Sequence, residues 1–337
     1  MPTFFLMIFS LVMALFASPW AAGAEEEALV IYSARKEHLL KPLLDIYRQK
    51  IGGVAIRYLT DGEGALLARL QAEGSATPAD LLITVDAGNL WSAAEKGMLA
   101  PVDSPVLTAN IPEPLRDPGN RWFGLSVRAR TIVYSTERVK ISELSTYEDL
   151  ANLSWKGRLC LRSSEKIYNQ SLVAMLIARL GEPATERMVR GWMANLAAPV
   201  FSNDTKLMEA MVAGRCDVGI VNTYYFGALQ KDKPKTSLAL FWANQQTSGT
   251  HINISGAGVT RHAKHPAAAL KLLEWLSTPE AQGLFAELNM EYPANPQVKP
   301  HAFVATWGDF KGEALNVSLA GRFQADAVRL MDRAGYP

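Results

Sequence analysis

The chain has 337 residues, of which 49% are hydrophobic and 20% are charged, and its formal net charge is +1. This is an ordinary globular composition, and the chain is long enough for two lobes that each bury a sizeable core. The near-neutral charge gives no electrostatic basis for binding nucleic acid or an anionic membrane surface. We therefore expect no nucleic-acid partner.

An apolar segment opens the chain, with no Lys, Arg, Asp or Glu before Glu25. Its most apolar part, residues 4–17, is shorter than the roughly 20 residues that a membrane-spanning helix needs. Small residues at positions 22–24 follow, which is typical of a secretory signal peptide over residues 1–24. Its first residues carry no Lys or Arg, which is atypical, so a retained anchor is the alternative. We expect cleavage, a periplasmic location and no membrane insertion afterwards.

The two cysteines, Cys160 and Cys216, lie far downstream of the expected cleavage site, so neither can carry a lipid there. In an exported compartment they can form a disulfide. Two buried free thiols fit the sequence nearly as well. No Cys/His spacing of the kind that binds a metal occurs in the sequence.

The first block of the chain alternates strand and helix three times. The expected strands are residues 28–33, 54–59 and 80–85, and the expected helices are 37–52, 65–74 and 89–99. This alternation predicts an α/β fold with a parallel sheet covered on both faces. Ligands of such sheets bind beyond the carboxyl ends of the strands, here at the turns 32–36, 60–64 and 85–89. The same turns would also need polar residues merely to cap helices.

A proline-rich stretch precedes a second α/β block at about residues 131–244, and helices are expected at 265–277, 278–289 and 318–334. Segments after about residue 250 are expected to add to each of the two blocks in turn. This predicts two lobes with a cleft between them. We expect one lobe to hold residues 25–126 plus about 250–296. The other should hold 127–249 plus about 297–337, with hinges near Ser126 and Thr250.

Six segments together resemble those of the periplasmic ferric-iron-binding proteins. They are VIYSARKEHLLKPLLDIY, PADLLITVDAGNL, FGLSVRARTIVYS, RSSEKIYNQSLVA, NTYYFG and HINISGAGVT, in the family's order. The likeness covers residues 28–334, and YNQS followed by NTYY is its most specific part. It implies a type II periplasmic-binding-protein fold that holds Fe³⁺ in the cleft. It also implies a monomeric protein that is not an enzyme and that docks onto an inner-membrane ABC permease.

The resemblance implies that Tyr168, Tyr224 and Tyr225 are the metal ligands. The family's usual first-lobe His or Tyr is replaced here by Lys36 and Glu37. Some family members have an acidic metal ligand in the next turn. Asp86 is close to that position in the sequence, although the residue that aligns with it is Val85. The likeness is greatest to the subgroup with three tyrosines and a synergistic anion such as carbonate, which implies an anion site at Ser33, Arg35 and Arg128.

The chemistry of these residue types agrees with that assignment. Fe³⁺ is a hard ion that prefers anionic oxygen, and three phenolates balance its charge. An added anion needs nearby cations such as Arg35, which lies at a helix N-terminus, and we expect only one of Arg128 and Arg130 to face the cleft. On a regular strand adjacent tyrosines would point to opposite faces, so we expect the backbone to depart from strand geometry there, with Gly227 permitting it.

Two other functions fit parts of the sequence. On the same fold the cleft could bind a small organic solute such as thiamine, a polyamine or a phosphonate, with the aromatic residues as stacking walls. An exported hydrolase is the alternative from a different class, but the sequence holds no GxSxG, HExxH or P-loop motif.

Overall fold

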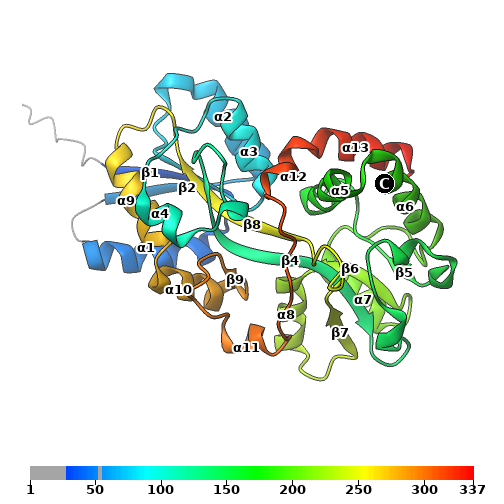
Figure 1. The fold of residues 1–337 in the computed structure, drawn as a ribbon. Helices are drawn as coiled ribbons and strands as arrows, with labels where there is room; N and C mark the ends of the chain where they lie inside the picture. Colours follow the sequence, from blue (N-terminus) through cyan, green and yellow to red (C-terminus); the bar gives the residue numbers. More distant parts are fainter. Residues whose placement is uncertain (1–27, 52–54) are drawn as a thin grey trace, which may run out of the picture.

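The structure is a computed structural model that describes residues 28–51 and 55–337. The expected signal peptide lies outside the described residues. The described chain forms two α/β lobes, with strands β4 (Phe123–Ser135) and β8 (Ile252–Val259) running between them (Figure 1). Within this part of the chain, no helix is both long and apolar enough to cross a membrane.

The first lobe is built on the parallel strands that the sequence predicts. Strand β1 (Ala28–Ser33) lies between β2 (Ala55–Thr60) and β3 (Leu81–Thr84), parallel to both. Strand β8 then pairs antiparallel with β3, and β4 pairs antiparallel with β8, so the complete sheet is mixed. Strand β1 is almost entirely buried, as a strand covered by helices on both faces should be.

Five longer helices cover this sheet, together with a short one. They are α1 (Glu37–Ile51), α2 (Glu63–Glu73), α3 (Ala87–Glu95), α4 (Pro105–Asn110), α9 (Pro266–Leu276) and α10 (Pro279–Asn289). In α1 the buried residues Leu40, Leu43, Leu44 and Tyr47 share one face, at helical spacing. They join a single hydrophobic core with the strands and with α9 and α10, which supports placing these late helices in the first lobe.

The second lobe continues the same sheet from the other end of β4. That end pairs antiparallel with β6 (Val218–Asn222) and β7 (Leu238–Phe241), and β5 (Leu159–Cys160) lies parallel to β6. Its helices are α5 (Ile167–Leu180), α6 (Glu182–Ala194), α7 (Asp204–Val212) and α8 (Thr223–Asp232). Short 3₁₀ turns occupy Gly74–Ala76, Glu113–Leu115, Ile141–Glu143, Asp149–Ala151 and Leu153–Trp155.

The C-terminal part of the chain connects the two lobes. Strand β9 (Tyr292–Pro293) pairs with β4, and α11 (Ala302–Ala305) and α12 (Ser318–Arg322) follow. The expected helix over residues 318–334 is interrupted at Phe323, where α13 (Gln324–Arg333) begins. Helix α12 contacts both α3 and α5, whereas α13 packs on α5 and α6. The connecting segment therefore belongs to both lobes, and the lobe boundaries given above stay a prediction.

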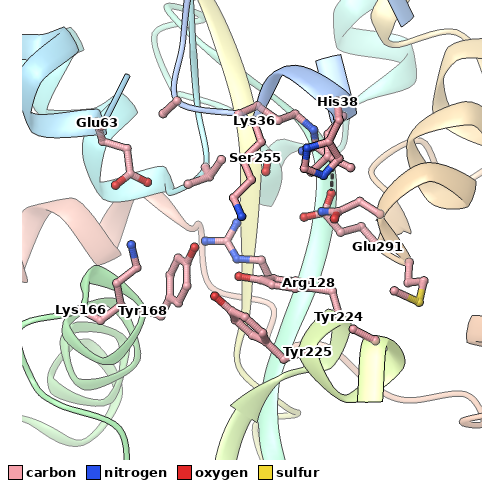
Figure 2. A pocket seen from close by; sticks show the side chains of 18 of the residues that line it. Lys36, His38, Glu63, Arg128, Lys166, Tyr168, Tyr224, Tyr225, Ser255 and Glu291 are labelled. Atoms are coloured by element: carbon pink, nitrogen blue, oxygen red, sulfur yellow. Dashed lines mark hydrogen bonds and ion pairs between the residues drawn. The ribbon is translucent and has the colours of Figure 1, made fainter. Parts of the chain in front are cut away.

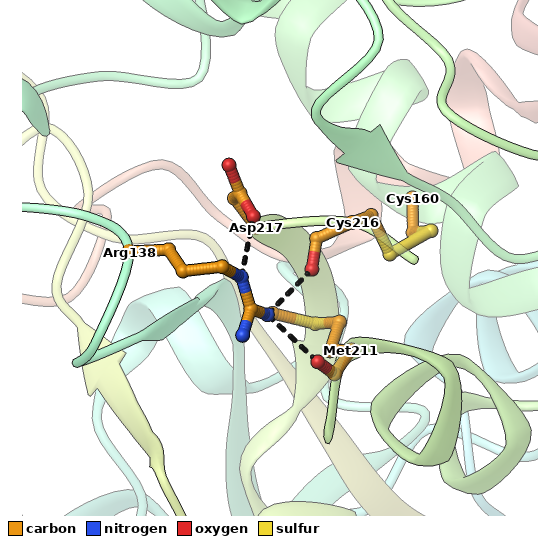
Figure 3. Close-up of a disulfide and its surroundings, with 5 residues drawn as sticks. All are labelled: Arg138, Cys160, Met211, Cys216 and Asp217. Atoms are coloured by element: carbon orange, nitrogen blue, oxygen red, sulfur yellow. Dashed lines mark hydrogen bonds and ion pairs between the residues drawn. A yellow bond between two sulfur atoms is a disulfide. The ribbon is translucent and has the colours of Figure 1, made fainter. Parts of the chain in front are cut away.

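The two cysteines form a disulfide between Cys160 on β5 and Cys216 just before β6 (Figure 3). Both are buried, and Arg138 closes the adjacent turn, with its guanidinium donating to the Met211 carbonyl at 2.8 Å and to the Cys216 carbonyl at 3.1 Å. The sequence left free thiols open as the alternative. The structure instead has the bond, joining the two neighbouring strands at the end of β6 away from Tyr224.

Removing the disulfide should destabilise the second lobe. The bond links positions 56 residues apart, and a loop of this length corresponds to roughly 4 kcal/mol of lost chain entropy in the unfolded state. We expect the Cys160→Ala/Cys216→Ala variant to unfold at clearly lower denaturant concentration by circular dichroism. Reduced wild-type protein is the control and should show a similar shift. Unchanged midpoints for both would contradict this.

Candidate metal centre

A cavity of about 450 Å³ lies between the lobes, with residues of both in its walls. The three tyrosines that the sequence singled out, Tyr168, Tyr224 and Tyr225, all line it (Figure 2). The structure therefore brings together side chains from two separate helices of the second lobe. The site resembles neither a His/Cys nor a carboxylate centre, since residues 28–51 and 55–337 contain no cluster of three or more His, Cys, Asp or Glu suited to a metal ion.

Tyr168 reaches the cavity because α5 begins immediately before it. The helix starts after Lys166, whose backbone is extended, and Tyr168 is its second residue. Cations surround its ring: the guanidinium carbons of Arg128 and Arg162 lie 5.3 and 5.5 Å from the ring centroid, and Lys166 Nζ lies 4.6 Å from it. Such contacts fix the ring and place positive charge where a phenolate would form.

Tyr224 and Tyr225 occupy the first turn of α8, which begins directly where β6 ends. Consecutive helical residues point about 100° apart rather than to opposite sides, so both rings face the cavity. Their centroids are 4.6 Å apart. The sequence correctly predicted a departure from strand geometry, but the helix start causes it.

The expected role of Gly227 is wrong, because this residue lies inside α8. Its lack of a side chain serves packing instead. A Cβ at this position would come within 2.8 Å of Met290 Sδ and 2.9 Å of the Trp307 ring. Gly227 thus lets α8 approach the C-terminal connecting segment closely.

The phenols of Tyr168 and Tyr224 stay protonated at neutral pH. Asn222 Nδ2 donates a hydrogen bond to Tyr224 Oη at 3.1 Å. Burial raises the pKa of Tyr168 to about 12, against the opposing effect of Arg128. Burial, followed by the charges of Tyr168 and Tyr225, raises the pKa of Tyr224 well above its usual value. A strongly polarising cation is needed to ionise this group of phenols.

Arg128 offers a free nitrogen to an accompanying anion. It projects from β4 into the cavity beside the tyrosines (Figure 2), and one nitrogen donates to Asp86 Oδ2 at 3.3 Å. Its Nη1 is buried and has no partner in the described part of the protein. That nitrogen can therefore donate to an anion bound in the cavity.

Arg35 and Ser33 differ in how far they reach the cavity. Arg35 lines the wall, and its Nη2 is bound to Glu291 Oε2 at 2.7 Å, while its Nε and Nη1 are buried and have no partner among the described residues. Ser33 is fully buried, does not line the cavity, and accepts a hydrogen bond from the Arg35 backbone N–H at 3.0 Å. The expected contact of Ser33 with the anion stays a prediction, and in this structure its hydroxyl caps the turn instead.

Asp86 is a structural residue and does not line the cavity. It caps α3 by accepting from the Gly88 N–H at 2.8 Å, and it also accepts from Ser171 Oγ at 3.0 Å and Asn253 Nδ2 at 2.9 Å. Burial raises its pKa to about 6, although Arg128 acts to lower it. Asp86 thus joins elements of the two lobes, and an expected metal-ligand role for it is not supported.

Several cavity residues went unnoticed in the sequence. The second lobe adds Arg162 and Lys166, and the first lobe adds Glu63. Glu63 lies in the turn 60–64. The sequence predicted this turn to lie near the ligand, because it follows the carboxyl end of a strand. Lys166 lies two residues before a predicted ligand. Position relative to recognised motifs was thus the available signal for both.

A buried network beneath the cavity fixes the tyrosine-bearing segments. As expected, only one of the two arginines faces the cavity: Arg128 lines it and Arg130 lies below. Arg130 donates to Asn169 Oδ1 at 2.9 Å, Asp204 Oδ2 at 3.0 Å and Asn222 Oδ1 at 3.1 Å. Asn169 adjoins Tyr168 and Asn222 precedes α8, so one guanidinium sets the spacing of both ligand segments.

A two-lobed α/β chain with a polar cavity between its lobes defines a solute-binding protein. The chain belongs to the bacterial extracellular solute-binding protein family, whose model matches residues 43–312. Over 94% of its length it is 40% identical to Iron uptake protein A2 of Synechocystis, of which it covers 92%. It is 27% identical over 83% of its length to the Fe(3+)-binding periplasmic protein of Serratia marcescens, of which it covers 84%.

Solved structures show the same likeness. A Trichodesmium protein in complex with iron and citrate ligands superimposes with a TM-score of 0.88 at 42% identity, covering 92% of this chain and 100% of that one. The ferric binding protein from Campylobacter jejuni gives a TM-score of 0.85 at 34% identity, with coverage of 92% and 100%. The predicted fold class and family are therefore confirmed.

Replacing Arg130 should both destabilise the protein and loosen the site. The Arg130→Met variant leaves Asp204 buried with a weakened counter-charge, because Arg162 Nη1 is 3.4 Å away and is its remaining cation. We expect a loss of about 3–5 kcal/mol in the free energy of unfolding. The Arg130→Met/Asp204→Asn variant should recover part of that loss. Equal stabilities of Arg130→Met and wild type in denaturant titrations would contradict this role.

Proposed function

We propose that this chain is an extracytoplasmic ferric-ion receptor that delivers iron to an ABC permease in the inner membrane. The observation that carries the proposal is the arrangement of Tyr168, Tyr224 and Tyr225 around one interlobe cavity. The iron-uptake and Fe(3+)-binding proteins similar to this chain support the same cargo. The function is binding and release, with no chemical conversion of a substrate.

Bound iron is held by the oxygens of the three tyrosines, which lose their protons on binding. Three phenolates neutralise Fe³⁺, and their hard anionic oxygens suit it better than imidazole or thiolate. An accompanying anion is held by the free Nη1 of Arg128, with Arg35 behind it and Lys166 beside it. Carbonate fits this description, and so does a carboxylate such as the citrate named with the Trichodesmium protein.

The cavity walls favour this cargo over the organic solutes considered from the sequence. Arg128, Arg162, Lys36 and Lys166 line the cavity and give it positive charge. That charge disfavours thiamine and polyamines, which are cations that bring no anion with them, whereas the phenolates and the accompanying anion neutralise Fe³⁺. A phosphonate is an anion and could bind the cations of the cavity. Its binding would not explain why three tyrosine hydroxyl groups line the same cavity. Thermal-shift measurements with Fe³⁺ and with 2-aminoethylphosphonate separate these two ligands.

Delivery would proceed by closure of the lobes around the ion and docking of the closed form on the permease. The proposed lobes are residues 25–126 with about 250–296, and 127–249 with about 297–337. Strands β4 and β8 cross between them, and two crossings permit a hinge motion that keeps each core intact. We propose that the receptor acts as a monomer in the periplasm.

Removing the phenol oxygens should abolish iron binding. Wild-type protein loaded with Fe³⁺ should show a visible phenolate-to-iron charge-transfer band, and Tyr224→Phe/Tyr225→Phe should lose it. We expect affinity to fall by more than about 100-fold, because ligands are lost outright. Tyr134→Phe, a buried tyrosine of the same lobe, is the matched control and should keep the band. Intact affinity in the double variant would refute the proposal.

Iron affinity should fall as the pH falls. Burial raises the pKa of Tyr168 to about 12 and that of Tyr224 well above its usual value, so both are protonated at neutral pH and must release protons to bind. Below these pKa values, each released proton makes affinity change roughly tenfold per pH unit. Chelator competition across about pH 6 to 8 measures this slope. Tyr224→Phe should have a shallower slope, and a pH-independent affinity would contradict the mechanism.

A further inference from the structure

One carboxylate in the cavity has no assigned role. Glu63 is the first residue of α2 and lines the cavity from the first lobe. Its side chain points toward the opposite wall, where Tyr168 and Lys166 lie (Figure 2). Its Oε1 is buried and has no hydrogen-bond partner within the described residues. A buried anionic oxygen without a partner is costly, so such an atom calls for a cation.

The other nearby acidic groups are already engaged. Glu291, the second acidic side chain in the cavity wall, accepts from Arg35 Nη2 at 2.7 Å and from Ser126 Oγ at 2.8 Å. Asp86 lies behind the wall, bound to Arg128 and its other partners. Among the acidic residues that line the cavity in the described chain, Glu63 is thus the one with a buried oxygen left to bind a cation.

We infer that Glu63 supplies a carboxylate oxygen to the bound ferric ion and is the first lobe's ligand for it. The inference rests on the proposed function, because the cation it invokes is the ion held by the three tyrosines. A carboxylate oxygen is the kind of donor that a hard trivalent ion prefers, and three phenolates leave coordination positions open. At the position where the family resemblance places a ligand, Lys36 is a cation and Glu37 does not line the cavity, so neither can serve.

The electrostatics of the cavity agree with a shared ion. The carboxylate of Glu63 faces the wall that holds Tyr168, so it would repel a phenolate formed there (Figure 2). A cation between them would turn that repulsion into attraction for both. Before the accompanying anion is counted, four anionic oxygens exceed the charge of Fe³⁺ by one. Lys166 and Arg162 line the cavity and can balance that excess, while Arg128 faces the anion.

The assignment gives the ion a structural consequence. Tyr168 comes from α5 and Tyr224 and Tyr225 from α8, both in the second lobe, whereas Glu63 begins α2 in the first. The ion would therefore join the two lobes directly. Iron loading would favour the closed form through coordination bonds from the ion to both lobes, in addition to contacts between the lobe surfaces.

The competing explanation is an ion pair between Glu63 and Lys166 that forms when the lobes close. Both predict a loss of affinity when Glu63 is replaced, but they differ in the spectrum. Loss of a carboxylate ligand makes the iron a stronger acceptor and moves the charge-transfer band to longer wavelength. Loss of an ion pair leaves the ligand set, and hence the band position, unchanged.

The test compares wild type with Glu63→Gln, Glu63→Asp and Lys166→Met, using Fe³⁺ and a competing chelator under identical anion concentrations. Glu287→Gln, an exposed residue on α10, is the control for loss of a carboxylate at the surface. We expect Glu63→Gln to lower affinity by about 10- to 100-fold and to move the band to longer wavelength. Glu63→Asp should be intermediate, and Lys166→Met should lower affinity less than Glu63→Gln does, because it removes a cation beside Tyr168 and no ligand.

Three outcomes would overturn the inference. Unchanged affinity and band position in Glu63→Gln would exclude a ligand role while leaving the tyrosine site intact. Equal losses in Glu63→Gln and Lys166→Met with an unchanged band would establish the ion pair instead. Wild-type protein that binds no ferric ion would remove the proposed function and this inference together, and circular dichroism of each variant separates these results from misfolding.

Discussion

The site depends on the buried pairing of Arg130 with Asp204. One guanidinium on β4 bonds to the start of α5, to α7 and to the end of β6, so three segments distant in sequence have one relative position. A buried charge pair contributes little net stability, but with every partner satisfied it specifies a single arrangement. The convergence of the tyrosine rings on one cavity follows from that fixed arrangement and from the two helix starts above it.

The sequence predicted the fold well where a local rule applied. Alternating strands and helices gave the parallel strands β1, β2 and β3, because their apolar runs and helix faces are set by near neighbours in the chain. The antiparallel insertion of β8 beside β3 depends on a pairing between distant segments, for which a single sequence holds no local signal. The break at Phe323 was likewise missed, since contacts with α3 and α5 decide where α12 ends.

The site was predictable to a different extent in each lobe. The tyrosines followed from motifs of the family resemblance, and the structure places all three in the cavity. The first lobe departs from the family at Lys36 and Glu37, so resemblance could not supply a ligand there. Ser33 and Asp86 were plausible by position, yet their oxygens are used within the protein, and only a hydrogen-bond inventory reveals which polar groups remain free.

Helix α12 bears on how the lobes can move. Gly321 lies so close to Trp91 of α3 that a Cβ there would come within 2.6 Å of the tryptophan side chain, and the next helix places Gln324 Nε2 3.0 Å from Gln170 Oε1 of α5. A rotation of one lobe against the other that preserved both contacts would have its axis beside α12. The lobes would then separate most on the side of the cavity away from α12. An ion would then enter and leave from that side. Replacing Gly321 by a larger residue would alter the relative rotation of the lobes although Gly321 does not line the cavity.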